Sequence, residues 1–106
     1  MKISNLRDFN GGWFVGDFEK SIVETKDFEV AYHFYKKNDE PTKPHMHKIA
    51  TEINLVISGH IIINGVDCYS GDIFTIYPGE WASAKFPMDT EIMIVKTPSV
   101  PGDKYD

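Results

Sequence analysis

Residues 44–59 read PHMHKIATEINLVISG, and this stretch carries the most informative spacing in the chain. His45 and His47 are separated by one residue, Glu52 follows five positions after His47, and an apolar run ends at Gly59. Side chains alternate between the two faces of a β-strand, so on a strand the two imidazoles share a face, about 6.6 Å apart. The stretch therefore predicts two histidines that converge on one point.

Glu52 is an odd number of positions from His47, so on one continuous strand it points to the opposite face. A turn or bulge within residues 48–51 brings it back beside the histidines. Two imidazoles and a carboxylate on one wall are the ligands of a facial triad, which holds Fe, Mn, Zn or Ni and leaves coordination positions open. The sequence predicts His45, His47 and Glu52 as metal ligands, and the alternative is a pocket that holds no metal.

The chain around this stretch predicts an all-β fold, because short apolar segments alternate with Gly and Pro throughout and no segment has the pattern of an amphipathic helix. Asn64-Gly65 between two apolar runs predicts a tight hairpin with a type I′ turn. The prolines of residues 38–44 predict a loop, and residues 98–106 are expected to lie extended along the surface. Strands are expected at residues 13–18, 28–37, 52–58, 60–63, 66–69, 73–77, 81–86 and 90–97.

Two of these segments alternate with a period of two, as a strand with one buried side does. In residues 28–37, Phe28, Val30, Tyr32 and Phe34 occupy one face and Glu29, Ala31, His33, Tyr35 and Lys37 the other. In the next segment, Glu52, Asn54 and Val56 are expected to face a cavity, with Ile53, Leu55 and Ile57 on the opposite face. Three large aliphatic side chains are too many for solvent, so either the N-terminal segment or the partner in a homodimer is expected to cover them, and the homodimer is preferred.

The length of 106 residues suits one domain, with a barrel core at about 28–97, N-terminal strands within 1–27 and a tail at 98–106. The net charge is −5 and Arg7 is the only arginine, which excludes the basic stripe of nucleic-acid binders and disfavours ligands with several phosphates. No apolar leader and no membrane-spanning run occurs in the sequence, so a cytoplasmic location without a membrane partner is expected. A small-molecule ligand is the partner that remains.

The spacing of His45, His47, Glu52 and Gly59 resembles the first motif of the cupin superfamily, His-x-His, three or four residues, Glu, six residues, Gly. The glycine and lead-in that precede this motif in the family are replaced here by a loop ending at Pro44. The second family motif is Gly, five residues, Pro-x-Gly, two residues, His, three residues, Asn. This chain matches it at Gly71-Asp72 and Gly79, and departs from it at Tyr77, Ala82 and Phe86, which stand at the Pro, His and Asn positions.

The resemblance spans about residues 28–97 and implies a double-stranded β-helix, a jelly-roll barrel with a ligand pocket inside, in a small single-domain protein. Metal-binding family members usually carry three His and one Glu, and the methyl group of Ala82 cannot replace the missing imidazole. The three remaining ligands then either leave open positions that suit catalysis or bind the ion too weakly to matter. His33, Tyr77 and Glu80 are candidates for a replacement ligand, and Trp81 is expected at the pocket mouth.

Three functions remain open from the sequence. The first is a divalent metal-dependent enzyme that acts on a small organic substrate as an isomerase, oxygenase or lyase. The second is a metal-free sugar isomerase or epimerase in which His45 or His47 serves as acid and base, because imidazole titrates near neutral pH. The third is a non-catalytic module that binds a small ligand.

Overall fold

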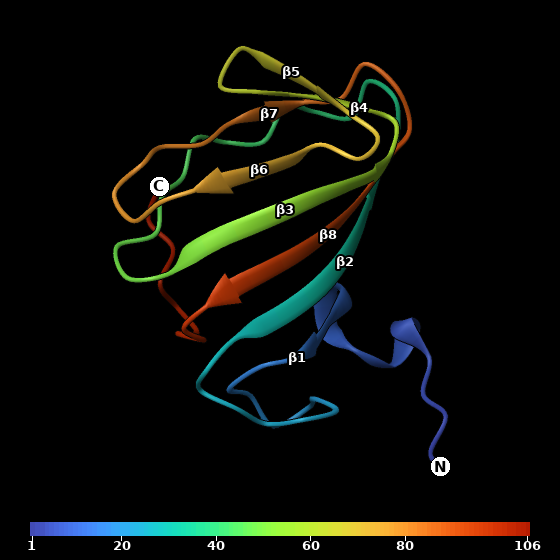
Figure 1. The fold of residues 1–106 in the computed structure, drawn as a ribbon, viewed down its shortest axis with the longest axis vertical. Helices are drawn as coiled ribbons and strands as arrows, with labels where there is room; N and C mark the ends of the chain where they lie inside the picture. Colours follow the sequence, from blue (N-terminus) through green and yellow to red (C-terminus); the bar gives the residue numbers. More distant parts are fainter.

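The structure is a computed structural model and describes all residues, 1–106. It is an all-β fold, as the sequence predicts (Figure 1). Two single-turn 3-10 helices at its N-terminal end were not predicted. No helix has the length and hydrophobicity that a membrane crossing requires. The elements are η1 (Leu6–Asp8), η2 (Asn10–Gly12), β1 (Trp13–Val15), β2 (Glu29–Tyr35), β3 (Thr51–Ser58), β4 (His60–Ile63), β5 (Val66–Tyr69), β6 (Ile73–Ile76), β7 (Ala84–Lys85) and β8 (Thr90–Thr97).

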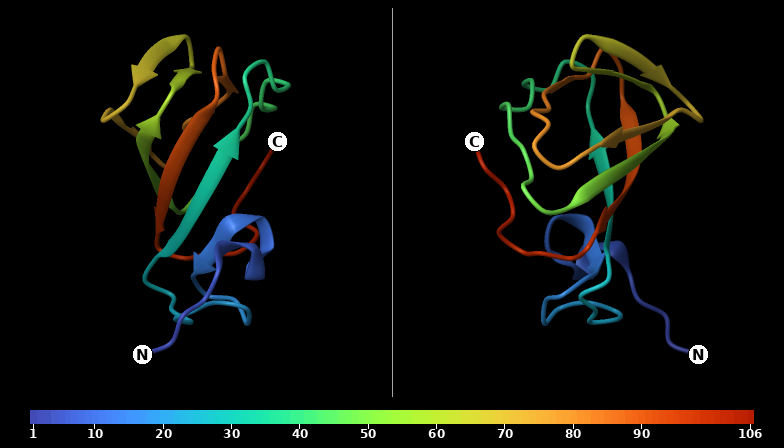
Figure 2. Two further views of the ribbon diagram at one scale, coloured as in Figure 1. Left: turned by 90° about the vertical axis from the view of Figure 1, so that its right-hand side faces the viewer. Right: turned by 60° about the vertical axis from the view of Figure 1, so that its left-hand side comes forward.

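The strands form two antiparallel sheets, one of five strands in the order β1-β2-β8-β3-β6 and one of three strands in the order β5-β4-β7. The two sheets face each other across the core, and the N-terminal residues lie beyond the far end of the larger sheet (Figure 2). This is the double-stranded β-helix that the sequence predicts. Buried aliphatic and aromatic side chains form one core cluster between the sheets: Val56, Ile61, Ile63, Ile76, Phe86, Ile92 and Ile94.

The β4–β5 hairpin turns at Asn64 and Gly65, which have φ angles of 49° and 78°. Positive φ at both central residues is the requirement of a type I′ turn, so the predicted turn is confirmed. The expected strand at residues 81–86 is shortened to the two residues of β7. The predicted loop at residues 38–44 contains no strand, although it runs beside β7, with Thr42 N donating to Ala84 O at 3.0 Å.

The outer face of the five-stranded sheet is apolar. Ile53, Leu55 and Ile57 are 37–39% exposed, while Asn54 and Val56 are buried, so the expected parity of β3 is confirmed. On β2 the inward face is the one with Glu29, Ala31, His33 and Tyr35, and the more apolar face points outward. Strand pairing extends the outer face in two rows, Val30–Val95–Ile53–Thr75 and Tyr32–Met93–Leu55–Ile73.

The C-terminal tail contradicts its predicted position along the surface. Ser99 and Asp103 are only 4% and 5% exposed, because their side chains hydrogen-bond inside the fold. Tyr105 pairs with Met46 through two backbone hydrogen bonds of 2.9 Å, and the Lys48 ammonium lies 4.0 Å from the centre of the Tyr105 ring. The tail is therefore a structural neighbour of the segment that precedes β3.

Gly59 connects β3 to β4 with a φ of +100°, and a Cβ there would clash with Asp89 O and lie 2.6 Å from Thr90 Oγ1. Gly71 has a similar φ of +90° with nothing within 4 Å. We expect Gly59→Ala to lower the free energy of unfolding by about 3 kcal/mol or more, and Gly71→Ala by about 1 kcal/mol, since only the first adds a backbone clash to the strain. Urea denaturation of both variants measures the difference, and equal losses would contradict this account.

Candidate metal centre

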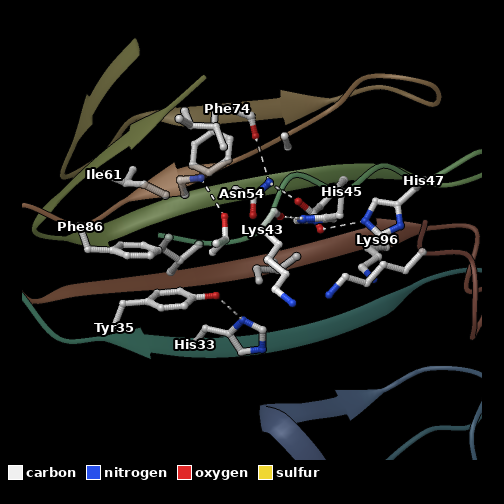
Figure 3. Close-up of a pocket in the computed structure, with 18 of the residues that line it drawn as sticks. His33, Tyr35, Lys43, His45, His47, Asn54, Ile61, Phe74, Phe86 and Lys96 are labelled. Carbon is white, nitrogen blue, oxygen red and sulfur yellow. Dashed lines mark hydrogen bonds and ion pairs between the residues drawn. The ribbon is translucent and has the colours of Figure 1, made fainter. Parts of the chain in front are cut away.

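The structure brings together the three side chains that the sequence predicts as ligands (Figure 3). One nitrogen or oxygen atom from each of His45, His47 and Glu52 lies within 4.8 Å of the others. His45 pairs with Ala82 across a single antiparallel bridge, and Glu52 is the second residue of β3. The two imidazole rings meet edge to face, with centroids 5.5 Å apart.

The turn expected within residues 48–51 is present, and Asp103 holds it. The backbone bends at Lys48 and Ile49. The Asp103 carboxylate accepts hydrogen bonds from the backbone N–H groups of Lys48, Ile49 and Ala50, at 2.9, 3.0 and 2.9 Å. Burial alone would raise the pKa of Asp103, but these three N–H donors lower it. The ionised carboxylate thus fixes the bend that returns Glu52 to the face of the histidines.

The backbone carbonyl of Asp103 also orients His47. A carbonyl can only accept, so the contact with His47 Nδ1 places the proton of the neutral imidazole on Nδ1 and leaves the lone pair on Nε2. The backbone of His47 is held in turn by Gly79, whose N–H donates to His47 O at 2.7 Å. Gly79 belongs to the second sequence motif, so the two motifs meet at this histidine.

His47 Nε2 is buried and has no hydrogen-bond partner. It lies 3.5 Å from Glu52 Oε1, which is longer than an ordinary hydrogen bond. Burying a polar atom without a partner is unfavourable, so an atom in this state marks a position where a further partner belongs. A borderline metal ion fits this position, because its donor set is two imidazoles and one carboxylate, all within reach of one point.

His47 and Glu52 each shift the pKa of the other toward its charged form. The neighbouring Glu52 carboxylate raises the pKa of His47, an effect that burial opposes and the Asp103 carbonyl supports. Burial alone would raise the pKa of Glu52, but His47, Asn54 and Lys96 together lower it. Glu52 is therefore ionised at neutral pH, and His47 holds a proton more readily than a free imidazole does.

These residues line a cavity of about 450 Å³ inside the barrel. Ala82 lines it as well and is 4% exposed, so the side of the cluster where the resemblance places a third histidine carries only a methyl group. Of the candidates for a replacement ligand, His33 lines the cavity, while Tyr77 and Glu80 do not. Trp81, expected at the mouth, is 50% exposed and not part of the lining.

His33 is already engaged by other groups. Its Nε2 donates to Gly11 O at 2.8 Å, and its Nδ1 accepts from the Tyr35 hydroxyl at 3.1 Å. Burial lowers the pKa of His33, with smaller opposing effects from the Gly11 carbonyl and Glu52. The structure therefore presents His33 and Tyr35 as a hydrogen-bonded pair on the β2 wall of the cavity.

Sequence reasoning missed three residues of the site: Asp103, Lys43 and Lys96. Asp103 follows a Pro-Gly turn in the tail, and no local pattern connects it with residues 48–50. The alternation of β8 did carry a signal for Lys96, because residue 96 has the same parity as the buried Ile92 and Ile94. No periodic pattern applies to Lys43, since it lies in the loop before His45.

No protein-family model and no curated protein matches the sequence, and the likeness to known proteins lies in the structure. An uncharacterized conserved protein with a double-stranded beta-helix domain from Klebsiella pneumoniae matches with a TM-score of 0.70 and 22% identity, over 99% of this chain and 96% of that one. An RmlC-like cupin from Shewanella frigidimarina matches with a TM-score of 0.64 and 19% identity, over 72% and 70% of the two chains. The chain has the cupin fold.

A third cupin-like match is an enzyme, the DMSP lyase DddQ from Ruegeria pomeroyi, with a TM-score of 0.73 and 11% identity. This chain covers 48% of the lyase, and the lyase covers 88% of this chain. At these low identities, the structural matches show a shared fold only, and the activity of this chain has to be argued from its own residues.

We expect Asp103→Ala to destabilise the protein by about 2 kcal/mol, because it leaves the N–H groups of residues 48–50 without their acceptor. Asp103→Asn keeps one carbonyl oxygen and should lose less. Asp106→Ala, an exposed change in the same tail, is the matched control and should be neutral. Urea denaturation at pH 7 measures all three variants, and an Asp103→Ala variant as stable as the control would remove Asp103 from this role.

Proposed function

We propose that this cupin-fold protein binds one divalent transition-metal ion through His45, His47 and Glu52 and acts on a small organic molecule in the barrel. The observation that carries the proposal is the buried, partnerless Nε2 of His47, within 4.8 Å of donor atoms from His45 and Glu52. Fe, Mn, Zn and Ni all accept this donor set. The proposal extends to isomerase, oxygenase or lyase chemistry, and DddQ is one example of a lyase with this fold.

The bound ion would polarise a carbonyl or hydroxyl group of the substrate, or activate dioxygen if it is iron. The residues of the chain do the rest. Asp103 O holds the proton of His47 on Nδ1 and so keeps Nε2 available, as a second-layer partner does in metal sites. Asn54 Nδ2 donates to Glu52 Oε2 at 3.2 Å and orients the carboxylate. Ala82 leaves one side of the cluster open to the cavity, where a substrate can approach.

One observation favours a second candidate, metal-free acid–base catalysis. His47 and Glu52 form a buried pair in which the histidine pKa is raised by the carboxylate. Such an imidazole can give and take a proton near neutral pH, as an isomerase or epimerase requires. In this reading His45 and His47 are the catalytic residues, and the cavity works without an ion.

Metal content distinguishes the two candidates. We expect protein purified without a metal-binding tag to carry close to one Fe, Mn, Zn or Ni ion per chain, and His47→Ala to lose it. His60→Ala is the matched control, because His60 bonds Asp67 at 2.7 Å outside the cavity. The Glu52 carboxylate raises the pKa of His47 above its ordinary 6.5, so proton competition at His47 should begin to weaken metal binding above that pH and should increase as the pH falls further.

Mass spectrometry of bound metals and metal titrations between pH 5.5 and pH 8 would make these measurements, with the pH window chosen around the ordinary pKa of imidazole. A wild-type protein that stays empty after addition of each of the four metals would contradict metal binding and favour the acid–base candidate. Equal retention by wild type and His47→Ala would contradict the proposed ligands.

We also propose that the protein is a homodimer formed through the outer face of the five-stranded sheet. The N-terminal segment lies beside β2 and leaves Ile53, Leu55 and Ile57 exposed (Figure 1). Ile73 and Phe34 extend the same apolar face and are 64% and 50% exposed. A continuous apolar patch of this kind typically marks an association surface, and two-fold dimers are the commonest assemblies.

Sedimentation velocity tests the dimer. The wild type should sediment as a dimer, and Leu55→Asp, which puts a charge at the centre of this face, should shift it to the monomer. Ile22→Asp is the matched control, because Ile22 is 57% exposed and lies outside the sheet. A monomeric wild type at micromolar concentration would overturn the dimer and leave the proposed metal centre untouched.

A further inference from the structure

The cavity has a charged end and an apolar end. Along the paired strands β3 and β8, the inward residues change from Glu52 opposite Lys96 to Val56 opposite Ile92. Figure 3 shows the same division, with His47 and Lys96 toward one end of the strands and Ile61 and Phe86 toward the other. Phe74 and Tyr35 also line the cavity, as does Trp13 beside Lys96, and Tyr35 stacks on Phe86 with centroids 4.1 Å apart.

Lys96 is already matched by carboxylates. In the strand register it lies between Glu29 on β2 and Glu52 on β3, and its Nζ is 3.4 Å from Glu29 Oε1. Its ammonium also lies 4.7 Å from the centre of the Trp13 ring, so its position in the wall is fixed from two sides.

Lys43 has no such partner. Its side chain extends into the cavity from the loop before His45 (Figure 3), and no carboxylate lies within 4.0 Å of its Nζ. At the mouth, Lys104 and Asp106 carry opposite charges. Together with Lys96, Glu29 and Glu52, the charged side chains of this end number three cations and three carboxylates. With a divalent ion bound, this end would carry a net excess of two positive charges.

The apolar end offers few hydrogen-bond partners to a ligand. The Tyr35 hydroxyl donates to His33 Nδ1, and Asn54 Nδ2 is used by Glu52 and Phe74 O. Hydroxyl groups of a sugar buried against Ile61, Phe74 and Phe86 would lose their water partners without replacement, which is unfavourable. An aliphatic or aromatic body fits this surface.

We propose that the cavity takes a small monocarboxylate with an apolar body, rather than a sugar or a neutral molecule. The carboxylate lies at the charged end within reach of Lys43, and the body packs against Ile61, Phe74 and Phe86. The inference rests on the proposed metal binding for its excess of positive charge, because without the ion the cations and carboxylates of this end balance.

Isothermal titration of the Zn-loaded protein tests the substrate class with three probes: 3-phenylpropanoate, its neutral amide 3-phenylpropanamide, and the polyhydroxylated acid gluconate. The first should bind at least about tenfold more tightly than either of the others, since only it satisfies both ends of the cavity. Lys43→Met should reduce binding of 3-phenylpropanoate severalfold and leave the amide unchanged. Lys85→Met, an exposed lysine of β7 outside the cavity, is the matched control and should change neither.

Equal binding of acid and amide by the Zn-loaded protein, or tighter binding of gluconate, would overturn this inference while the metal site stands. If the protein binds no metal, the proposed function fails separately, and the same titrations are run on the metal-free protein. A preference for 3-phenylpropanoate that Lys43→Met removes would then still support the carboxylate site. Equal affinity for the acid and the amide would overturn it.

Discussion

Asp103 is the residue on which the candidate site depends, although it lies in the tail and does not face the cavity. Its carboxylate accepts hydrogen bonds from the N–H groups of residues 48–50, and its backbone carbonyl accepts a hydrogen bond from His47 Nδ1–H. The first contact places Glu52 on the same side as the histidines, and the second sets which nitrogen of His47 is free. The buried carboxylate itself is stabilised by the three N–H donors, which lower its pKa. One side chain and one carbonyl therefore determine both the geometry and the protonation of the cluster.

Sequence reasoning succeeded where local periodicity decides the structure. The parity of β3 correctly separated Glu52, Asn54 and Val56 from the exposed aliphatic residues, and Asn64-Gly65 gave the hairpin turn. It also required a bend within 48–51, because an odd spacing cannot place His47 and Glu52 on one face of a straight strand. What it could not supply was the partner of that bend, since Asp103 is 53 to 55 residues away in the chain.

The orientation of β2 shows a second limit of periodicity. Alternation in residues 28–37 identifies two faces without saying which one is inside. In an ordinary barrel the apolar face would be buried, but here Glu29, His33 and Tyr35 point inward and Val30, Tyr32 and Phe34 outward. In this orientation Glu29 lies opposite Lys96 at the charged end of the cavity. The outward residues of β2 join the apolar rows of β3 and β8. The orientation of β2 thus places polar side chains in the cavity and apolar side chains on the outer face of the sheet.

The docking of the tail also sets the order in which the site can mature. All eight strands end before residue 98, so the ribosome has made every strand before it adds Asp103 and Tyr105. Before the tail docks, the N–H groups of residues 48–50 lack the Asp103 acceptor, and His47 lacks the carbonyl that fixes its tautomer. The His45, His47 and Glu52 cluster therefore takes its final geometry only when the tail docks, after the last strand has been made.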